Sequence, residues 1–184
     1  SLFRASPLLP VTAHYPGLAS VTSAVASVTG LDVFGAGLIV AGAARLLAMV
    51  AVFLLFEDVS SSARLAGLAA LFYTAHANFI FFGGQYAYES LAIPLAVFAI
   101  ASVNRWSHRE NESARRGWAV AALLVITALA MTHHVTIYAL CAFLVAASVV
   151  HACVGRRSAA NPWPFALFAA AAVEDHRRPV RIAA

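Results

Sequence analysis

The sequence contains no lysine, few charges of either sign and only two cysteines. Charged residues make up 11% of its 184 residues, whereas an ordinary soluble domain has about 25%. Hydrophobic residues make up 62%, and the mean hydropathy is +0.82. In so apolar a chain, the net charge of +4 reports on membrane topology rather than on a nucleic-acid partner. The composition therefore disfavours soluble periplasmic binding proteins, nucleic-acid binders and disulfide scaffolds.

Common motifs for disulfide, metal, haem and nucleotide sites are also missing. Cys141 and Cys153 fall on one expected helix about 18 Å apart, beyond the roughly 7 Å limit for a disulfide. No HExxH, CxxCH, P-loop or GxGxxG pattern occurs. Four histidines could lie at the same depth in the membrane: His14, His76, His133 and His134. Adjacent residues on a helix point about 100° apart, so His133 and His134 would not both enter one site, which disfavours a metal or haem site.

Long apolar runs dominate the chain instead. The clearest covers 33–56, and its roughly 24 residues reach about 36 Å as a helix, enough to cross a bilayer with some tilt. An amphipathic interfacial helix is expected around 18–28. Further apolar helices are expected at 63–73, 86–103, 118–131, 135–154 and 163–173. We therefore expect an all-α, multi-span integral membrane protein with about five to six membrane helices plus the interfacial helix.

The domain organisation follows from the two ends of the chain. Residues 1–173 are expected to form a partial transmembrane domain, because the chain starts at Ser1 without a signal-peptide pattern, which indicates a missing N-terminus. The last apolar run, about 11 residues long, is half a span. Residues 174–184 are therefore expected to be a polar tail that is truncated or altered.

The arginines predict the orientation in the cell membrane. Short cytoplasmic loops are enriched in basic residues, and seven arginines occupy alternate turns of the expected bundle: Arg64, Arg105, Arg109, Arg115, Arg116, Arg156 and Arg157. The opposite loops lack basic residues, apart from Arg4 near the N-terminus. We expect the arginine-bearing loops to be cytoplasmic and the loops with histidine, tyrosine and Glu89 to be extracytoplasmic.

Three extracytoplasmic turns, distant in sequence, bring polar groups to one membrane face. Gln85 and Tyr86 precede Glu89 by four and three residues and share its face if the helix already exists there. Polar groups near membrane depth commonly face a bundle interior or a watery cavity. The alternative is that they are interfacial anchors, with Glu89 stabilising a helix start. The candidates are His14, Tyr15, His76, Asn78, Gln85, Tyr86, Tyr88, Glu89, Thr132, His133 and His134.

Arg45 is the one charged residue inside the 33–56 run. A charge at this depth costs about 2.5–3.5 kcal/mol on insertion scales, so Arg45 needs a partner. Three partners remain open: Glu89, the phosphate of a bound lipid, or the interface reached by snorkelling.

The order of these motifs resembles the membrane glycosyltransferases of the GT-C superfamily. The resemblance covers about residues 15–154 and rests on motifs that are individually weak but share an order and a membrane side. They are His14-Tyr15-Pro16-Gly17, Ala44-Arg45-Leu46-Leu47, Asn78-Phe79-Ile80-Phe81-Phe82, Gln85-Tyr86-Ala87-Tyr88-Glu89-Ser90 and Thr132-His133-His134.

The resemblance implies an enzyme that moves a sugar from a polyprenyl-phosphate donor to a lipid, glycan or protein acceptor outside the cytoplasm. Some members use a divalent metal ion; no cofactor is otherwise implied. Glu89 and His133 would be catalytic, and Arg45 would contact the donor phosphate. The other substrate-binding residues would be His14, Tyr15, His76, Gln85, Tyr86, Tyr88 and His134.

One departure from the superfamily concerns its main catalytic acid, which usually follows the first transmembrane helix. We expect this acid upstream of Ser1, so the role does not pass to Asp32 and the 184-residue chain is expected to be inactive alone. The alternative functions are a transporter or channel subunit, in which Arg45 and Glu89 line a pathway, and a non-catalytic assembly subunit.

Overall fold

The computed structural model describes residues 15–82, 85–154 and 160–177. Within these ranges the chain forms helices and no strand, which confirms the all-α prediction. The helices are α1 Gly17–Thr29, α2 Val33–Ser60, α3 Ala63–Ala75, α4 Ala77–Phe82, α5 Tyr88–His108, α6 Glu112–Thr132, α7 His134–Val154 and α8 Trp163–Arg177.

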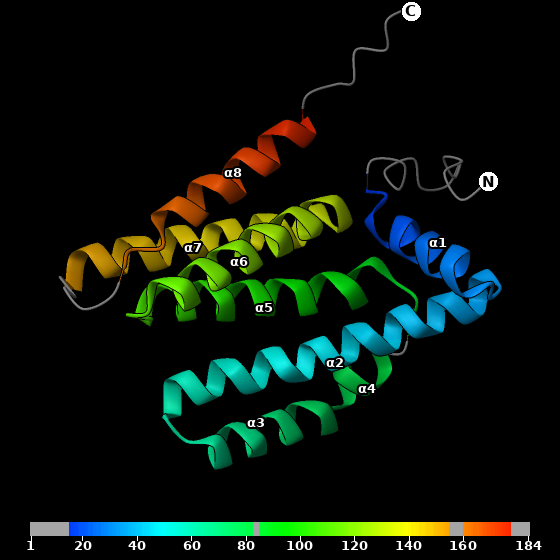
Figure 1. Cartoon of the computed structure of the whole chain (residues 1–184), viewed down its shortest axis with the longest axis horizontal. Helices are drawn as coiled ribbons and strands as arrows, with labels where there is room; N and C mark the ends of the chain where they lie inside the picture. The colour runs from blue at the N-terminus through cyan, green and yellow to red at the C-terminus, as the bar shows by residue number, and fades with distance from the viewer. Residues whose placement is uncertain (1–14, 83–84, 155–159, 178–184) are drawn as a thin grey trace, which may run out of the picture.

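Four of the described helices, α2, α5, α6 and α7, are long and apolar enough to cross a membrane. The two other expected spans, α3 and α8, are present but have 13 and 15 residues, which gives them about 20–22 Å against a hydrocarbon core of about 30 Å. Figure 1 shows α5 between α2 and α6, with α3 on the outer side of α2 and α8 beside α7. The chain therefore is a membrane protein built as a row of packed helices.

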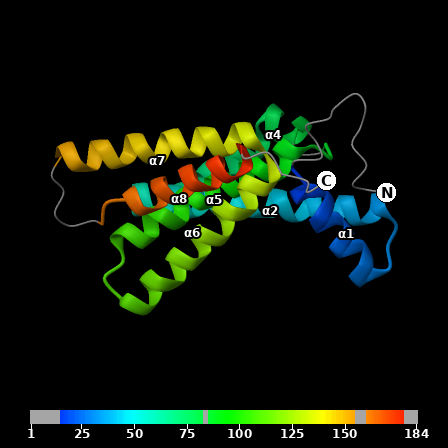
Figure 2. The same cartoon turned by 90° about the horizontal axis from the view of Figure 1, so that it is seen from above.

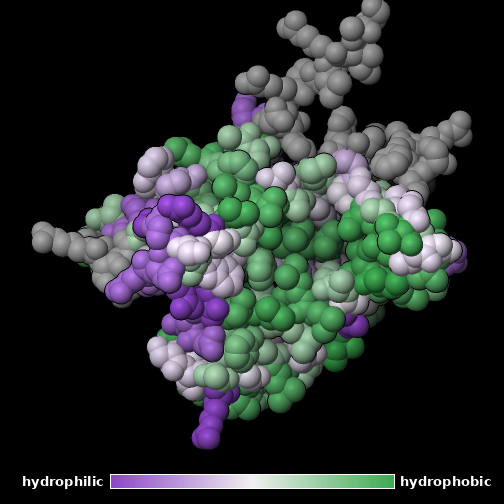
Figure 3. Space-filling model, in the orientation of Figure 1, coloured by the Kyte–Doolittle hydropathy of each residue, from purple (hydrophilic) through white to green (hydrophobic). Residues whose placement is uncertain are grey.

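Small side chains let the helices approach closely. Alanines at 36, 51, 92, 99, 122 and 169 are fully buried between helices, together with Ile126 and Leu129. Small residues commonly line helix contacts in membranes, where close packing replaces the hydrophobic effect. Large apolar side chains such as Phe34 and Phe72, both 74% exposed, point outward instead. Figure 3 shows this apolar surface, with hydrophilic residues gathered at one end of the bundle.

That hydrophilic end is the arginine end, which we define by Arg64, Arg105, Arg109, Arg115 and Arg116. It contains the turn between α2 and α3 and the turn between α5 and α6. Arg156 and Arg157 lie outside the described residues. The opposite end, which we call the histidine end, contains Tyr15, His76, Glu89, His133 and His134. Figures 1 and 2 agree that α1 and α4 lie at the histidine end.

Several predicted helix boundaries are wrong, most of them because polar residues extend a helix. α6 begins at Glu112 rather than 118, since the Asn111 side chain accepts hydrogen bonds from Ser113 N and Ala114 N at 3.0 and 3.2 Å and a good N-cap starts a helix. α2 continues to Ser60 and includes two carboxylates that were expected in a loop. α8 continues to Arg177, past the expected end at 173.

The carboxylates at the end of α2 hold a buried arginine of α5. Arg105 Nη2 lies 2.7 Å from Glu57 Oε2 and 3.0 Å from Asp58 Oδ1, and Arg105 Nε donates to Asp58 Oδ2 at 3.1 Å. Asn104 donates to the same Asp58 oxygen at 3.2 Å. Arg105 is 9% exposed, so this network neutralises a charge that would otherwise be costly to bury.

Candidate functional site

The three turns of the histidine end meet as the sequence predicts. The rings of Tyr15 and His134 lie in contact, tilted by 31° with centroids 4.9 Å apart, and His133 Nε2 lies 3.5 Å from Glu89 Oε1. A Cβ on Gly17 would lie 2.5 Å from Thr132 Oγ1, so the start of α1 fits against the end of α6 only because that residue is glycine. His14, a predicted site residue, lies outside the described residues.

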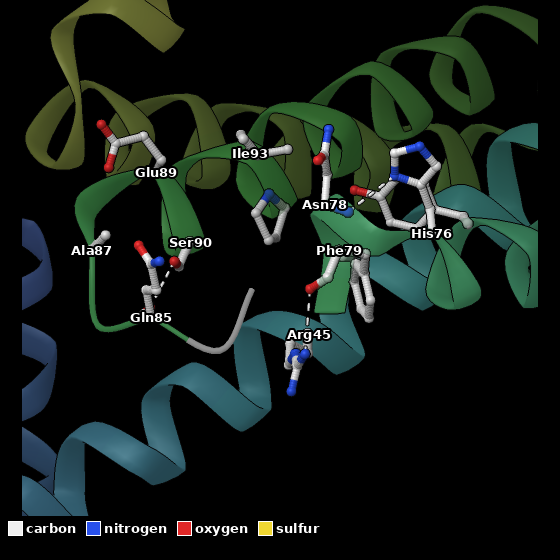
Figure 4. Close-up of a pocket in the computed structure, with 12 residues that line it drawn as sticks. Arg45, His76, Asn78, Phe79, Gln85, Ala87, Glu89, Ser90 and Ile93 are labelled. Carbon is white, nitrogen blue, oxygen red and sulfur yellow. Dashed lines mark hydrogen bonds between the residues drawn. The ribbon is translucent and has the colours of Figure 1, made fainter. Parts of the chain in front are cut away.

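A cavity of about 780 Å³ opens at this end between α2, the α3–α4 junction and α5. This volume is typical of ligand pockets, which combine apolar walls with a few polar groups. Arg45 and Glu89 are the two charged residues on its wall. Figure 4 shows most of the lining residues around it. They are Arg45, Ala48, Tyr73, His76, Asn78, Phe79, Gln85, Ala87, Glu89, Ser90, Ile93 and Pro94.

Arg45 finds a partner that the sequence did not suggest. Its Nη2 donates to the carbonyl oxygens of Phe79 and Ile80 at 3.3 and 3.0 Å, and the guanidinium lies over the Phe79 ring, 5.3 Å from its centroid. Both carbonyls belong to the last turn of α4, where helical donors are missing and the helix dipole attracts a cation. No ion pair joins Arg45 to Glu89 in the described part of the chain, and Figure 4 shows the Glu89 carboxylate turned away from Arg45.

The guanidinium of Arg45 keeps unused hydrogen-bond donors. A guanidinium has five N–H groups, and the two bonds to α4 use one nitrogen. The Nε atom is buried and has no hydrogen-bond partner among the residues that the structure describes. A buried unsatisfied donor costs free energy, so a negatively charged ligand in the cavity would stabilise this group.

Glu89 joins the cavity to a histidine on the break between α6 and α7. Burial lowers the pKa of His133 more than the attraction of Glu89 raises it, and His134 lowers it further. His133 is therefore neutral at neutral pH, and its contact with Glu89 is not a true ion pair. His133 Nε2 lies 3.5 Å from Glu89 Oε1, and its Nδ1 shares a hydrogen bond of 2.8 Å with the Thr136 hydroxyl, in which the tautomer decides the donor. The Glu89 side chain is 58% exposed and remains free to bind a ligand.

His76 and Gln85 reach the cavity from the other side. His76 Nδ1 accepts a hydrogen bond from Asn78 N at 3.2 Å, so its ring is held at the start of α4. The backbone carbonyl of Gln85 accepts from Ser90 Oγ at 2.7 Å. Because α5 starts at Tyr88 rather than 86, the helix does not yet exist at Gln85 and Tyr86, and the condition under which they would share a face with Glu89 is not met.

The structure therefore divides the predicted site residues into two groups. Five of them line the cavity: Arg45, His76, Asn78, Gln85 and Glu89. Tyr15, His133 and His134 form a cluster beside it, which touches the cavity through Glu89. Tyr86 points elsewhere and bonds to Thr22, and Tyr88 is not part of the cavity wall.

Sequence reasoning missed two aromatic residues of the wall. Tyr73 and Phe79 pack against each other with ring centroids 5.1 Å apart, one from each side of the helix break. Tyr73 precedes His76 by one helical turn, and this spacing is a signal that could have identified it.

The residues that the structure describes contain no group of three histidine, cysteine or acidic side chains able to hold a metal ion. Comparison with known proteins adds no relative: no family model, no curated protein and no solved structure matches this chain.

Proposed function

We propose that this chain is part of a membrane glycosyltransferase that takes a sugar from a polyprenyl-phosphate donor on the extracytoplasmic face. The cavity at the histidine end is the observation that carries the proposal. It sets one cation, Arg45, and one carboxylate, Glu89, at different places on a largely apolar wall. A lipid-linked phosphosugar needs this combination, because its phosphate is anionic, its sugar is rich in hydroxyls and its chain is apolar.

The two charged groups suit different parts of such a donor. The free donors of Arg45 match the phosphate, since guanidinium groups bind phosphate oxygens through parallel hydrogen bonds. They would also stabilise the negative charge that develops on the phosphate as it leaves. Glu89 can accept hydrogen bonds from sugar hydroxyls or a proton from an acceptor hydroxyl, and neutral His133, 3.5 Å away, does not cancel its charge.

Binding of a long-chain polyprenyl phosphate to the purified chain in lipid nanodiscs tests the proposal. Arg45→Gln is expected to weaken binding by roughly 10- to 100-fold, since a hydrogen bond to a charged group contributes about 1.5–3 kcal/mol. Arg45→Lys keeps the charge but not the parallel geometry, so an intermediate loss is expected. Arg64→Gln removes an exposed arginine at the other end and serves as the matched control.

The decisive comparison is between the affinities of the two glutamine variants for the polyprenyl phosphate. Equal binding by Arg45→Gln and Arg64→Gln, with both proteins folded, would remove the phosphate assignment. In the full-length protein, Glu89→Gln is expected to lower sugar transfer at normal protein levels, with Glu110→Gln in the α5–α6 turn as its control.

A transporter is the second candidate, and one observation favours it. The apolar segment of α3 and α4 is broken at His76, directly beside the cavity and Arg45. Interrupted helices next to a polar site are typical of secondary transporters. Uptake of a phosphorylated solute into vesicles by the full-length protein, without transfer of any sugar, would favour this function over the glycosyltransferase.

A further inference from the structure

The break between α3 and α4 forms one side of the cavity. Four side chains line the cavity from this break: Tyr73, His76, Asn78 and Phe79. Figure 4 shows the labelled members of this group, His76, Asn78 and Phe79, on the opposite side of the cavity from Glu89. This side therefore combines two aromatic rings with two polar side chains and has no carboxylate.

A hydrogen bond inside the break determines what His76 offers to a ligand. The backbone N–H of Asn78 donates to His76 Nδ1 at 3.2 Å, so this ring nitrogen is an acceptor and carries no proton. A neutral imidazole with an acceptor Nδ1 has its proton on Nε2. Within the described part of the chain, no hydrogen bond uses Nε2. His76 therefore presents one neutral N–H donor.

The Asn78 side chain adds a second uncharged group. Its amide has two donor hydrogens and an acceptor oxygen, and it makes no hydrogen bond to another residue that the structure describes. Uncharged groups that donate and accept match sugar hydroxyls, which also do both. The neighbouring rings of Tyr73 and Phe79, with centroids 5.1 Å apart, give apolar surface for the C–H groups of a sugar. This side of the cavity therefore suits a sugar.

The phosphate position proposed above lies on the same short helix. Arg45 donates to the carbonyl oxygens of Phe79 and Ile80. These residues follow His76 by three and four positions, which is about 5–6 Å along a helix at 1.5 Å per residue. A phosphate and the far hydroxyls of the sugar bonded to it are separated by a comparable length. One phosphosugar can therefore contact Arg45 and His76 at the same time.

We propose that His76 and Asn78 form the sugar subsite of this cavity and that they select an uncharged sugar; this rests on the proposed function. A sugar carboxylate would meet no cation there, since the cation of the wall, Arg45, is engaged by the phosphate, and an unpaired charge is costly to remove from water. With the sugar on the side of α4, Glu89 on α5 is left for the hydroxyl of the acceptor.

Two lipids that differ only in the sugar test the subsite. One is a long-chain polyprenyl-phosphate hexose, prepared with glucose, galactose or mannose. The other is the methyl phosphodiester of the same polyprenyl phosphate, which has the same charge and no sugar. Their affinities are measured for the purified chain in lipid nanodiscs. The chain is expected to bind the best hexosyl lipid about 10-fold more tightly, through hydrogen bonds to uncharged groups. The uronic acid of that hexose is expected to bind no more tightly than the methyl phosphodiester.

Variants of the two polar residues separate sugar contact from helix capping. His76→Ser keeps an oxygen that can accept from Asn78 N, as serine does at helix starts, but its side chain is too short to replace Nε2. Asn78→Leu removes the amide at similar size. Each variant is expected to weaken the hexosyl lipid about 3- to 10-fold and to leave the methyl phosphodiester unchanged. Thr74→Val is the matched control, because its hydroxyl donates to Leu71 O at 2.9 Å and does not line the cavity.

The subsite and the phosphate assignment fail in different ways. Arg45→Gln is expected to weaken both lipids, because both contain the phosphate. Equal affinity of the unmodified chain for the hexosyl lipids and the methyl phosphodiester would overturn the subsite, as would loss of both lipids in His76→Ser and Asn78→Leu. Tighter binding of the uronic acid than of the hexose would overturn the selection of an uncharged sugar. Unchanged binding of both lipids by Arg45→Gln would overturn the proposed phosphate site, while the difference between the two lipids still reports on His76 and Asn78.

Discussion

The two ends of the bundle pair their charged side chains differently. At the arginine end, Arg105 is enclosed by Glu57 and Asp58 with distances of 2.7–3.1 Å, so the positive and negative groups neutralise one another. At the histidine end, Arg45 bonds to backbone carbonyls, its Nε has no hydrogen-bond partner within the described part of the chain, and Glu89 remains 58% exposed. Opposite charges therefore share a cavity there without forming a pair.

This difference separates a structural role from a ligand-binding one. A paired charge has its hydrogen bonds satisfied and gains little from a ligand, whereas an incompletely satisfied buried group gains from a ligand of opposite charge. Position on a membrane helix does not by itself distinguish the two roles, since Arg105 and Arg45 each lie on one. The hydrogen-bond partners of each arginine decide whether it can still bind an anionic ligand.

The largest expected effect is the all-or-none labelling of cysteines at the two ends. In a background without Cys141 and Cys153, Gln85→Cys is expected to react with an impermeant thiol reagent in intact cells. Ser61→Cys and Glu110→Cys, from the two turns of the arginine end, are expected to be protected, because basic loops remain in the cytoplasm. The reverse pattern would place the cavity in the cytoplasm and reject the proposed donor side.

Arg105→Leu is expected to have the largest effect on stability. The change leaves Glu57 and Asp58 without their partner, with side chains 37% and 19% exposed, and breaking a buried pair costs about 3–5 kcal/mol. Denaturant unfolding in detergent micelles measures the loss. Arg116→Leu is the control, because its pair with Glu112 is exposed and contributes about 0.5 kcal/mol or less. Similar losses of unfolding free energy in both variants would show that the Arg105 network does not stabilise the bundle more than an exposed ion pair does.

The pH dependence of His133 is the smallest expected effect. Burial lowers its pKa in the folded state, so the unfolded chain binds more protons below its ordinary pKa of about 6.5. The contribution to stability is complete above that pH and decreases as the pH falls through it. His133→Gln is expected to flatten the profile of melting temperature between neutral and mildly acid pH. Stability that rises on acidification through His133 would instead indicate a charged pair with Glu89.

Much of the fold could be predicted because hydrophobic length is a local property of the chain. The run at 33–56, the helix from His134 to Val154 and the Ser62 N-cap of α3 all follow from apolar length and helix start signals. The sequence did not predict the boundaries at Glu112, Ser60 and Arg177, because charged residues that follow or precede an apolar run are typical of loops. Such residues can also continue a helix at a membrane surface.

The candidate site was only partly predictable for a different reason. The sequence by itself determined that the chain is a helical membrane protein, that Arg45 needs a partner, and that histidines, tyrosines and Glu89 gather at one end. Only the tertiary structure decided that Arg45 bonds to α4, that Glu89 turns toward His133 and that Tyr86 faces Thr22 across 64 positions of chain. The length of an apolar segment and the positions of its charges can be seen in the sequence. The contact partners of a side chain depend on which helix faces meet when small side chains let the helices pack.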